Sequence, residues 1–171
     1  KQIKVINLDD RSIKGWWNKC LLFKPGLLSS SCLYLDLDMI IIKNIDEFII
    51  KNQYLNILCN PLTLNNKIYH KINSSMMFWN AENKELNKIW FRYSENKYFY
   101  DNHKALLHEE KGDQKVILES SIKYRFFPGD KIRYFKFIEE KEIKEPLDEN
   151  ISIIVCKGKK QKDHKSNYFV K

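Results

Sequence analysis

The hydrophobic positions of the chain gather in short runs between polar turns, and the longest run is CLYLDLDMIII, residues 32–42. Leu, Tyr and Ile at this density predict a strand that is buried on both faces, as in a parallel sheet. Two acids, Asp36 and Asp38, interrupt the run. Successive strand side chains point to opposite faces, so both carboxylates are expected on the same face. We therefore expect Leu33–Asp38 to be a central strand with the two acids at its carboxyl end, facing a cleft.

The rest of the pattern predicts further strands and helices around this run. Apolar residues recur at helical spacing at Leu86, Ile89, Trp90 and Tyr93, which indicates an amphipathic helix from about Asn83. The segment 61–69 is polar and is expected to be irregular, with a turn at 65–66. Other helices are predicted at 15–23 and 46–50, and other strands at 3–7, 54–59, 76–80, 124–127, 132–138 and 151–156. A length of 171 residues is typical of one domain, and we expect an α/β fold.

The two acids predict a site for a divalent cation. Close carboxylates in a poorly solvated place repel each other, and a bound cation removes that repulsion. Hard oxygen ligands suit Mg²⁺ or Mn²⁺, which commonly use one or two protein carboxylates together with substrate phosphates. The alternative is a strand that ends at Leu35, with Asp36 and Asp38 solvated in the following loop.

Two further polar segments are candidates for ligand contacts. Asn73, Ser74 and Ser75 run into a buried strand, so their donors and acceptors lie at a strand edge, although an ordinary turn would give the same pattern. Asp113 and Gln114 follow Gly112 and open an apolar run, where Asp113 is also a good helix N-cap.

Charge and cysteine content narrow the classes of function. The net charge is +8, and the last fifteen residues hold six lysines and one aspartate, a basic tail that suits phosphate groups, nucleic acid or an anionic membrane surface. Only four of the 30 basic residues are Arg, which disfavours base-specific nucleic-acid readout. The four cysteines are widely spaced, so we expect reduced thiols in a cytoplasmic protein and no zinc site. No apolar run reaches the ~18 residues that span a bilayer.

The sequence 33–48, with LYLDLDMII followed by NIDEF, resembles the metal-binding signature of GT-A fold glycosyltransferases. The resemblance is strongest to the glycogenin and lipopolysaccharide galactosyltransferase-like group, and the Trp-rich segment 16–26 and the segment 73–80 extend it. It implies a metal-dependent, retaining enzyme that moves a sugar from a nucleotide-sugar donor, most often a UDP-sugar, to a saccharide or other acceptor.

The resemblance also assigns residue roles. Asp36 and Asp38 would bind Mn²⁺ or Mg²⁺, and the catalytic pair Asp113 and Gln114 would reach the donor sugar. Substrate contacts would come from Asn73, Ser74, Ser75, Lys159 and Lys160, the two lysines at the diphosphate. The implied architecture is a GT-A-like (Rossmann-like), mainly parallel mixed sheet flanked by helices.

Two departures from the family pattern affect these expectations. The family has a His-x-Gly-x-x-Lys-Pro loop whose His is the third metal ligand, whereas this chain has Cys156 and Lys157 before Gly158. A protonated Lys repels a cation, and thiolate suits Mg²⁺ or Mn²⁺ poorly. The metal-motif strand also begins only about 30 residues into the sequence, so the first strand–helix–strand unit, which holds the nucleotide in the family, is expected to be missing.

The sequence is also compatible with two other functions. The chain could be a catalytically degenerate member that keeps the fold as a binding module, as the missing His and front unit suggest. It could also be a basic nucleic-acid-binding protein, which requires aromatic residues interleaved with Lys on an exposed face. Apart from substrates, the only further partner expected is an anionic membrane in peripheral contact with the basic tail, residues 157–171.

Overall fold

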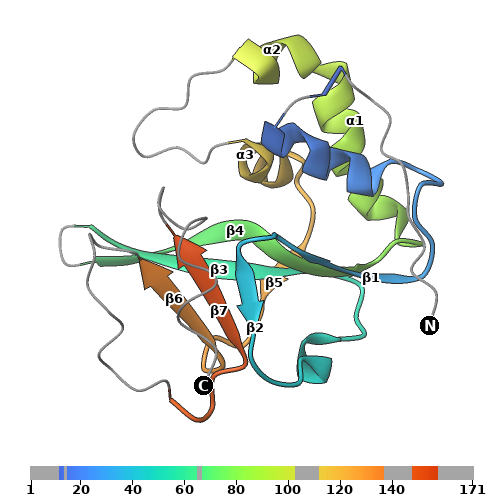
Figure 1. Ribbon diagram of the computed structural model, residues 1–171. Helices are drawn as coiled ribbons and strands as arrows, with labels where there is room; N and C mark the ends of the chain where they lie inside the picture. The colour runs from blue at the N-terminus through green and yellow to red at the C-terminus, as the bar shows by residue number, and fades with distance from the viewer. Residues whose placement is uncertain (1–11, 14, 65–66, 103–111, 137–147, 158–171) are drawn as a thin grey trace. The chain divides into compact units, whose positions relative to one another are not determined.

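The computed structural model describes residues 12–13, 15–64, 67–102, 112–136 and 148–157. The chain divides into two compact units (Figure 1). The first unit comprises Lys1–Cys32 and Trp79–Lys123, and the second comprises Leu33–Phe78 and Tyr124–Lys171. The first contains the longer helices and the second most of the strands, so the expected mixture of α and β structure is confirmed.

The first unit is built from short helices. The amphipathic helix predicted from its spacing is confirmed, because Asn83 accepts a hydrogen bond from the backbone N–H of Glu85 and the apolar positions Leu86, Ile89 and Tyr93 are buried. The segment predicted as a helix at 15–23 is a 3₁₀ helix. The helices are η1 (Gly15–Phe23), η3 (Lys84–Leu86), α1 (Asn87–Glu95), α2 (Lys97–Asn102) and α3 (Asp113–Glu119).

Aromatic packing holds these helices together. The ring of Trp17 on η1 stacks on Tyr93 of α1 at a centroid distance of 5.6 Å, and it also contacts Tyr100 of α2 at 5.7 Å. Phe23 packs on Trp79 at 5.1 Å. Phe23, Trp79, Tyr93 and Tyr100 are buried and Trp17 is half-buried, so these rings contribute both buried apolar area and favourable ring contacts to this unit.

The second unit contains two mixed sheets. The first has the strand order β1-β4-β3-β5, in which β3 pairs antiparallel with β4 and parallel with β5. The second has the order β2-β7-β6, in which β7 pairs antiparallel with β2 and parallel with β6. The strands are β1 (Ser31–Leu35), β2 (Met39–Ile41), β3 (Leu55–Leu64), β4 (Lys67–Asn80), β5 (Tyr124–Phe126), β6 (Ile132–Lys136) and β7 (Ile153–Lys157), and η2 (Asp46–Phe48) is a 3₁₀ turn.

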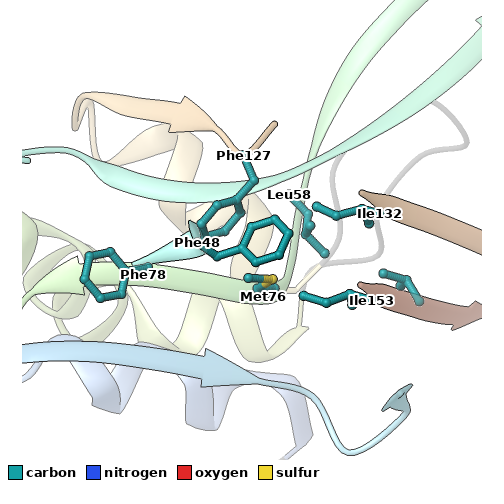
Figure 2. Close-up of a cluster of buried hydrophobic side chains, with 8 residues drawn as sticks. Phe48, Leu58, Met76, Phe78, Phe127, Ile132 and Ile153 are labelled. Carbon is teal, nitrogen blue, oxygen red and sulfur yellow. The ribbon is translucent and has the colours of Figure 1, made fainter. Parts of the chain in front are cut away.

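The core of the second unit is formed by side chains from both sheets (Figure 2). Leu58 and Met76 come from the β3–β4 pair, and Ile153 comes from β7. Phe48 of η2 packs edge-on against Phe127, with ring centroids 5.7 Å apart. The apolar faces of the two sheets therefore bury each other, which is the usual way that a sheet removes its hydrophobic face from water.

The structure corrects two expectations about the strands. The run 32–42 is two strands, β1 and β2, in different sheets, and β1 lies at the edge of its sheet, not at its centre. None of the β1 residues is fully buried. The prediction failed because a high density of apolar residues indicates a strand but does not determine its position in a sheet. Both sheets are mixed: β3 with β5 and β6 with β7 pair parallel, whereas β2 with β7 and β3 with β4 pair antiparallel. The segment expected to be irregular at 61–69 instead extends β3 and β4, apart from residues 65–66, which lie outside the described part.

Candidate metal and ligand site

Asp36 and Asp38 lie in the turn that carries the chain from one sheet of the second unit to the other. Strand β1 ends at Leu35, and the backbone N–H of Met39 donates to the carbonyl of Asp36 at 3.2 Å, which closes a turn over 36–39. Leu37 is 98% exposed at the tip of this turn. The backbone matches the alternative in which the strand ends at Leu35, but both acids are half-buried, not fully solvated.

An irregularity in β4 lies directly beside this turn. In the pairing of β3 with β4, Ile57 is opposite Met77 whereas the next residue, Leu58, is opposite Asn73, so residues 74–76 are inserted between two consecutive rungs of the ladder. The carbonyl of the inserted Ser75 accepts a hydrogen bond of 2.7 Å from the backbone N–H of Asp36. A bulge bends its strand and redirects side chains, and bulges are frequent beside active sites. The structure thus brings the predicted segments 36–38 and 73–75 together.

The polar side chains of this bulge hold it in shape. The side-chain oxygen of Asn73 accepts a hydrogen bond of 2.9 Å from the backbone N–H of Ser75. Asn73 and Ser74 are buried, and Ser75 is half-buried. Asn73 therefore stabilises the backbone that contacts Asp36, which is a positioning role distinct from the direct substrate contact that the resemblance implies.

The two carboxylates have different surroundings. Oδ1 of Asp36 accepts a hydrogen bond of 2.6 Å from the hydroxyl of Tyr34, two residues earlier on the same face of the chain. Oδ1 of Asp38 is buried and has no hydrogen-bond partner among the described residues. A buried carboxylate oxygen without a donor is costly, and a bound cation or water is a usual explanation for one.

The end of β7 lies next to Asp38. The backbone N–H of Cys156 donates to the carbonyl of Asp38 at 3.4 Å, one step beyond the rung that pairs Met39 with Val155. Cys156 is buried, and Lys157 follows it as the last residue of the strand. The structure therefore places the end of β7 beside the acid turn. Lys159 and Lys160 lie outside the described residues.

The residues at this turn fit a cation that takes few protein ligands. No group of three or more His, Cys, Asp or Glu side chains within the described ranges is arranged to hold a metal ion. Two carboxylates nevertheless suffice for Mg²⁺-type sites, in which waters and substrate phosphates supply the remaining oxygens. The buried Asp38 oxygen supplies a hard ligand without a competing donor in the described part, so the donor set suits Mg²⁺ or Mn²⁺.

Asp113 and Gln114 belong to the first unit, at the start of α3. The N-cap is Gly112 and no side chain caps the helix, so the expectation that Asp113 is the cap is wrong. Gly112 has φ of +59°, and a Cβ on it would lie 2.6 Å from the Trp16 ring. Asp113 is buried instead, and burial followed by the charge of Asp113 raises the pKa of the Cys20 thiol well above its usual value.

Sequence reasoning missed Tyr34 and Asn56. The signal for Tyr34 was its position two residues before Asp36, which places both side chains on one face. Asn56 is buried and donates to the carbonyl of Phe78 at 3.3 Å, and it exchanges hydrogen bonds with the side chain of Asn52. No local pattern marks an asparagine that is buried by a neighbouring strand.

None of the four cysteines, all of which lie in the described part, forms a disulfide. None of the helices in the described part is long and apolar enough to cross a membrane. Comparisons with protein-family models, with curated proteins and with solved structures gave no match.

Proposed function

We propose that the second unit binds a divalent cation, Mn²⁺ or Mg²⁺, through Asp36 and Asp38, and that the protein is a retaining glycosyltransferase with a GT-A-like fold and a nucleotide-sugar donor. The observation that carries the proposal is the buried Oδ1 of Asp38, which has no hydrogen-bond donor among the described residues. It occurs where the acid turn meets both the β4 bulge and the end of β7. A carboxylate in that position is best explained by a positive ligand.

The residues of the site divide into ligands and positioning groups. Asp36 and Asp38 are the proposed ligands, and when bound the cation would neutralise the diphosphate leaving group as a Lewis acid. Tyr34 holds the carboxylate of Asp36 through its 2.6 Å hydrogen bond, which limits the rotation of that side chain. Asn73 fixes the bulge whose Ser75 carbonyl anchors the Asp36 backbone.

The contributions of the other residues rest on the resemblance alone. Asp113 and Gln114 would orient the donor sugar, Ser74 and Ser75 would line the substrate site, and Lys159 and Lys160 would meet the diphosphate. The acceptor is proposed to be a saccharide or another hydroxyl-bearing molecule.

Metal-dependent stabilisation tests the first step. The native chain should melt at a higher temperature in millimolar MnCl₂ than in EDTA, because a ligand that binds only the folded state stabilises it. Asp38→Asn should abolish the shift, whereas Asp130→Asn, the same change at an exposed acid of the second unit, should leave it intact. An equal melting temperature of the native chain with and without MnCl₂ would contradict the cation site.

Donor binding tests the second step. Calorimetric titration with a UDP-sugar in MnCl₂ should show binding that Asp36→Asn and Asp38→Asn both weaken. Release of UDP in the presence or absence of an acceptor then measures transfer or donor hydrolysis. Cation binding without any interaction with nucleotide-sugars would retain the site but reject the glycosyltransferase proposal.

A second candidate is a glycosyltransferase-like module that binds a nucleotide-sugar or glycan without catalysis. Two observations favour it: no third acidic, His or Cys ligand joins the two acids within the described ranges, and Lys157 directly follows Cys156, whose backbone N–H contacts the carbonyl of Asp38. A positive charge there would attract a diphosphate while opposing a cation. Binding of a UDP-sugar that is unchanged by EDTA and yields no UDP would support this candidate over the enzyme.

A further inference from the structure

A thiol and an imidazole meet on the hairpin formed by β3 and β4, outside the proposed cation site. Sγ of Cys59 lies 3.2 Å from Nδ1 of His70. In the antiparallel register Cys59 is opposite Ile72 and Pro61 is opposite His70, so Cys59 and His70 are diagonal neighbours across the two strands. Diagonal neighbours two positions apart share a face of the sheet, which explains why these side chains reach each other.

The surroundings of the pair hold it in place without closing it off. The His70 ring packs against Phe126 of β5 at a centroid distance of 6.3 Å, and Phe126 packs in turn against Tyr124 at 5.6 Å. The carbonyl of Cys59 accepts a hydrogen bond from the hydroxyl of Tyr134 on β6. His70 is exposed and Cys59 is half-buried, so a small molecule can approach the sulfur.

The chemistry of the pair depends on where the thiol proton can go. Partial burial raises the pKa of the Cys59 thiol, so the group is protonated near neutral pH. The thiolate is the nucleophile, and a protonated thiol therefore needs a base to react. Nδ1 of a neutral imidazole can accept the proton when Nε2 carries the ring hydrogen.

We propose that Cys59 and His70 form a base-assisted thiol site that is modified by small disulfides such as oxidised glutathione. Nδ1 of His70 takes the proton from Sγ as Sγ attacks one sulfur of the disulfide. The new bond joins Sγ to that sulfur, the original disulfide bond breaks, and the departing thiolate recovers the proton from His70. The products are a mixed disulfide on Cys59 and one small thiol.

The chain contains a matched control for this proposal. Cys32 is also half-buried, and burial raises the pKa of its thiol as well. Its Sγ faces the backbone carbonyls of Ser29 and Ser30, at 4.0 and 3.8 Å, and a carbonyl cannot take the proton. The two thiols thus differ chiefly in whether a base faces the sulfur. Cys20 and Cys156 are buried, at 1% and 5% exposure.

The experiment follows the modification of each cysteine in the native chain by oxidised glutathione, using mass spectrometry of the intact protein and of its peptides. We expect Cys59 to react on the order of tenfold faster than Cys32, below the ~10²–10⁴ that a base contributes in an evolved active site. Cys20 and Cys156 should stay unmodified, which also confirms that the chain is folded. A rate at Cys59 no higher than at Cys32 overturns the proposal, whatever any variant does.

The variant His70→Gln then tests the role of the imidazole. Glutamine keeps a polar side chain at this exposed strand position but cannot take up the proton at neutral pH. We expect the rate at Cys59 to fall about tenfold, to the level of Cys32, while the rate at Cys32 is unchanged. A rate at Cys59 that does not change in His70→Gln, with Cys20 and Cys156 still protected, would show that the imidazole is only a packing neighbour. The outcome is independent of cation or nucleotide-sugar binding.

Discussion

The two acids of the candidate site should respond in opposite directions to the same substitution when no metal is present. One carboxylate oxygen of Asp38 is buried and accepts no hydrogen bond from a described residue, whereas Asp36 accepts a hydrogen bond from Tyr34. In EDTA, Asp38→Asn removes an uncompensated charge and should raise the free energy of unfolding. Asp36→Asn weakens an existing charge-assisted bond and should lower it.

The magnitudes follow from the cost of leaving a buried group unpaired. A buried acceptor without a donor costs about 1–3 kcal/mol. The amide introduced by Asp38→Asn would remain partly buried, so the gain should lie near the lower limit, about 1 kcal/mol. A hydrogen bond to a charged group contributes about 1.5–3 kcal/mol against about 0.5–1.5 for a neutral one, so Asp36→Asn should cost about 1 kcal/mol. Each change corresponds to roughly 2–4 °C in Tm for a chain of this size.

Saturating metal should reverse the order of stability. At a MnCl₂ concentration about 100 times the Kd, the native protein gains about 2.7 kcal/mol, and a variant that lacks one ligand gains much less. The native chain should therefore be less stable than Asp38→Asn in EDTA and more stable than it in MnCl₂. Such a crossing is not expected of an acid that has only a structural role.

The assay is urea denaturation followed by far-UV circular dichroism, in EDTA and in MnCl₂. Tyr34→Phe should reproduce the loss seen in Asp36→Asn, and the double variant should show that the two losses are not additive, because they remove one bond. Asp130→Asn should change the stability by less than about 0.5 kcal/mol. If Asp38→Asn loses about 1 kcal/mol or more in EDTA, its carboxylate already has a compensating partner and the reasoning fails.

Three further predictions concern other parts of the chain. Burial raises the pKa of Glu119, but the hydrogen bond from Tyr100 and the contact from a neighbouring lysine outweigh burial and lower this pKa. Tyr100→Phe removes the 2.5 Å hydrogen bond to Glu119, so the substitution should cost about 1 kcal/mol of stability at pH 7. The contribution of a lowered pKa is complete above the unfolded value of about 4.3 and is lost as the pH falls through the folded pKa, so this cost should shrink in urea titrations at successively lower pH. Gly112→Ala should lower Tm clearly more than Gly26→Ala. Both positions have positive φ, which costs an alanine about 1–3 kcal/mol, but only at Gly112 would the added Cβ meet a side chain; equal shifts would contradict this. Lys157→His should increase the rise in Tm that MnCl₂ produces, and no increase would show that the end of β7 does not face the cation.

Tyr100 also predicts behaviour in alkali. Burial, with the hydrogen bond to Glu119, raises the pKa of Tyr100 to about 12. The protonated phenol is therefore favoured in the folded state, and its contribution is complete below the unfolded value of about 10 and is lost as the pH rises from about 10 toward 12. We expect the alkaline loss of stability in this interval to be smaller in Tyr100→Phe than in the native chain.

Much of the local structure could be predicted from the sequence, because local structure depends on neighbours along the chain. The spacing of Leu86, Ile89 and Tyr93 determines a helix with one apolar face, and the structure buries all three. The strands at 124–126 and 132–136 likewise follow from short apolar runs bounded by turn residues. The acid pair itself, and its chemical suitability for a hard cation, is also a property of the sequence.

Tertiary structure alone decided what surrounds these residues. Whether the run 32–42 is one buried strand or two strands in two sheets depends on pairing with β4 and β7, which are distant in sequence. The bulge at 74–76 and the contact of Cys59 with His70 arise from the register of β3 with β4, and the burial of one Asp38 oxygen arises from the tertiary packing around the turn. The hydrophobic periodicity of the sequence indicates which side of a helix or strand is apolar. Which other element covers that side depends on packing and strand pairing across the whole chain.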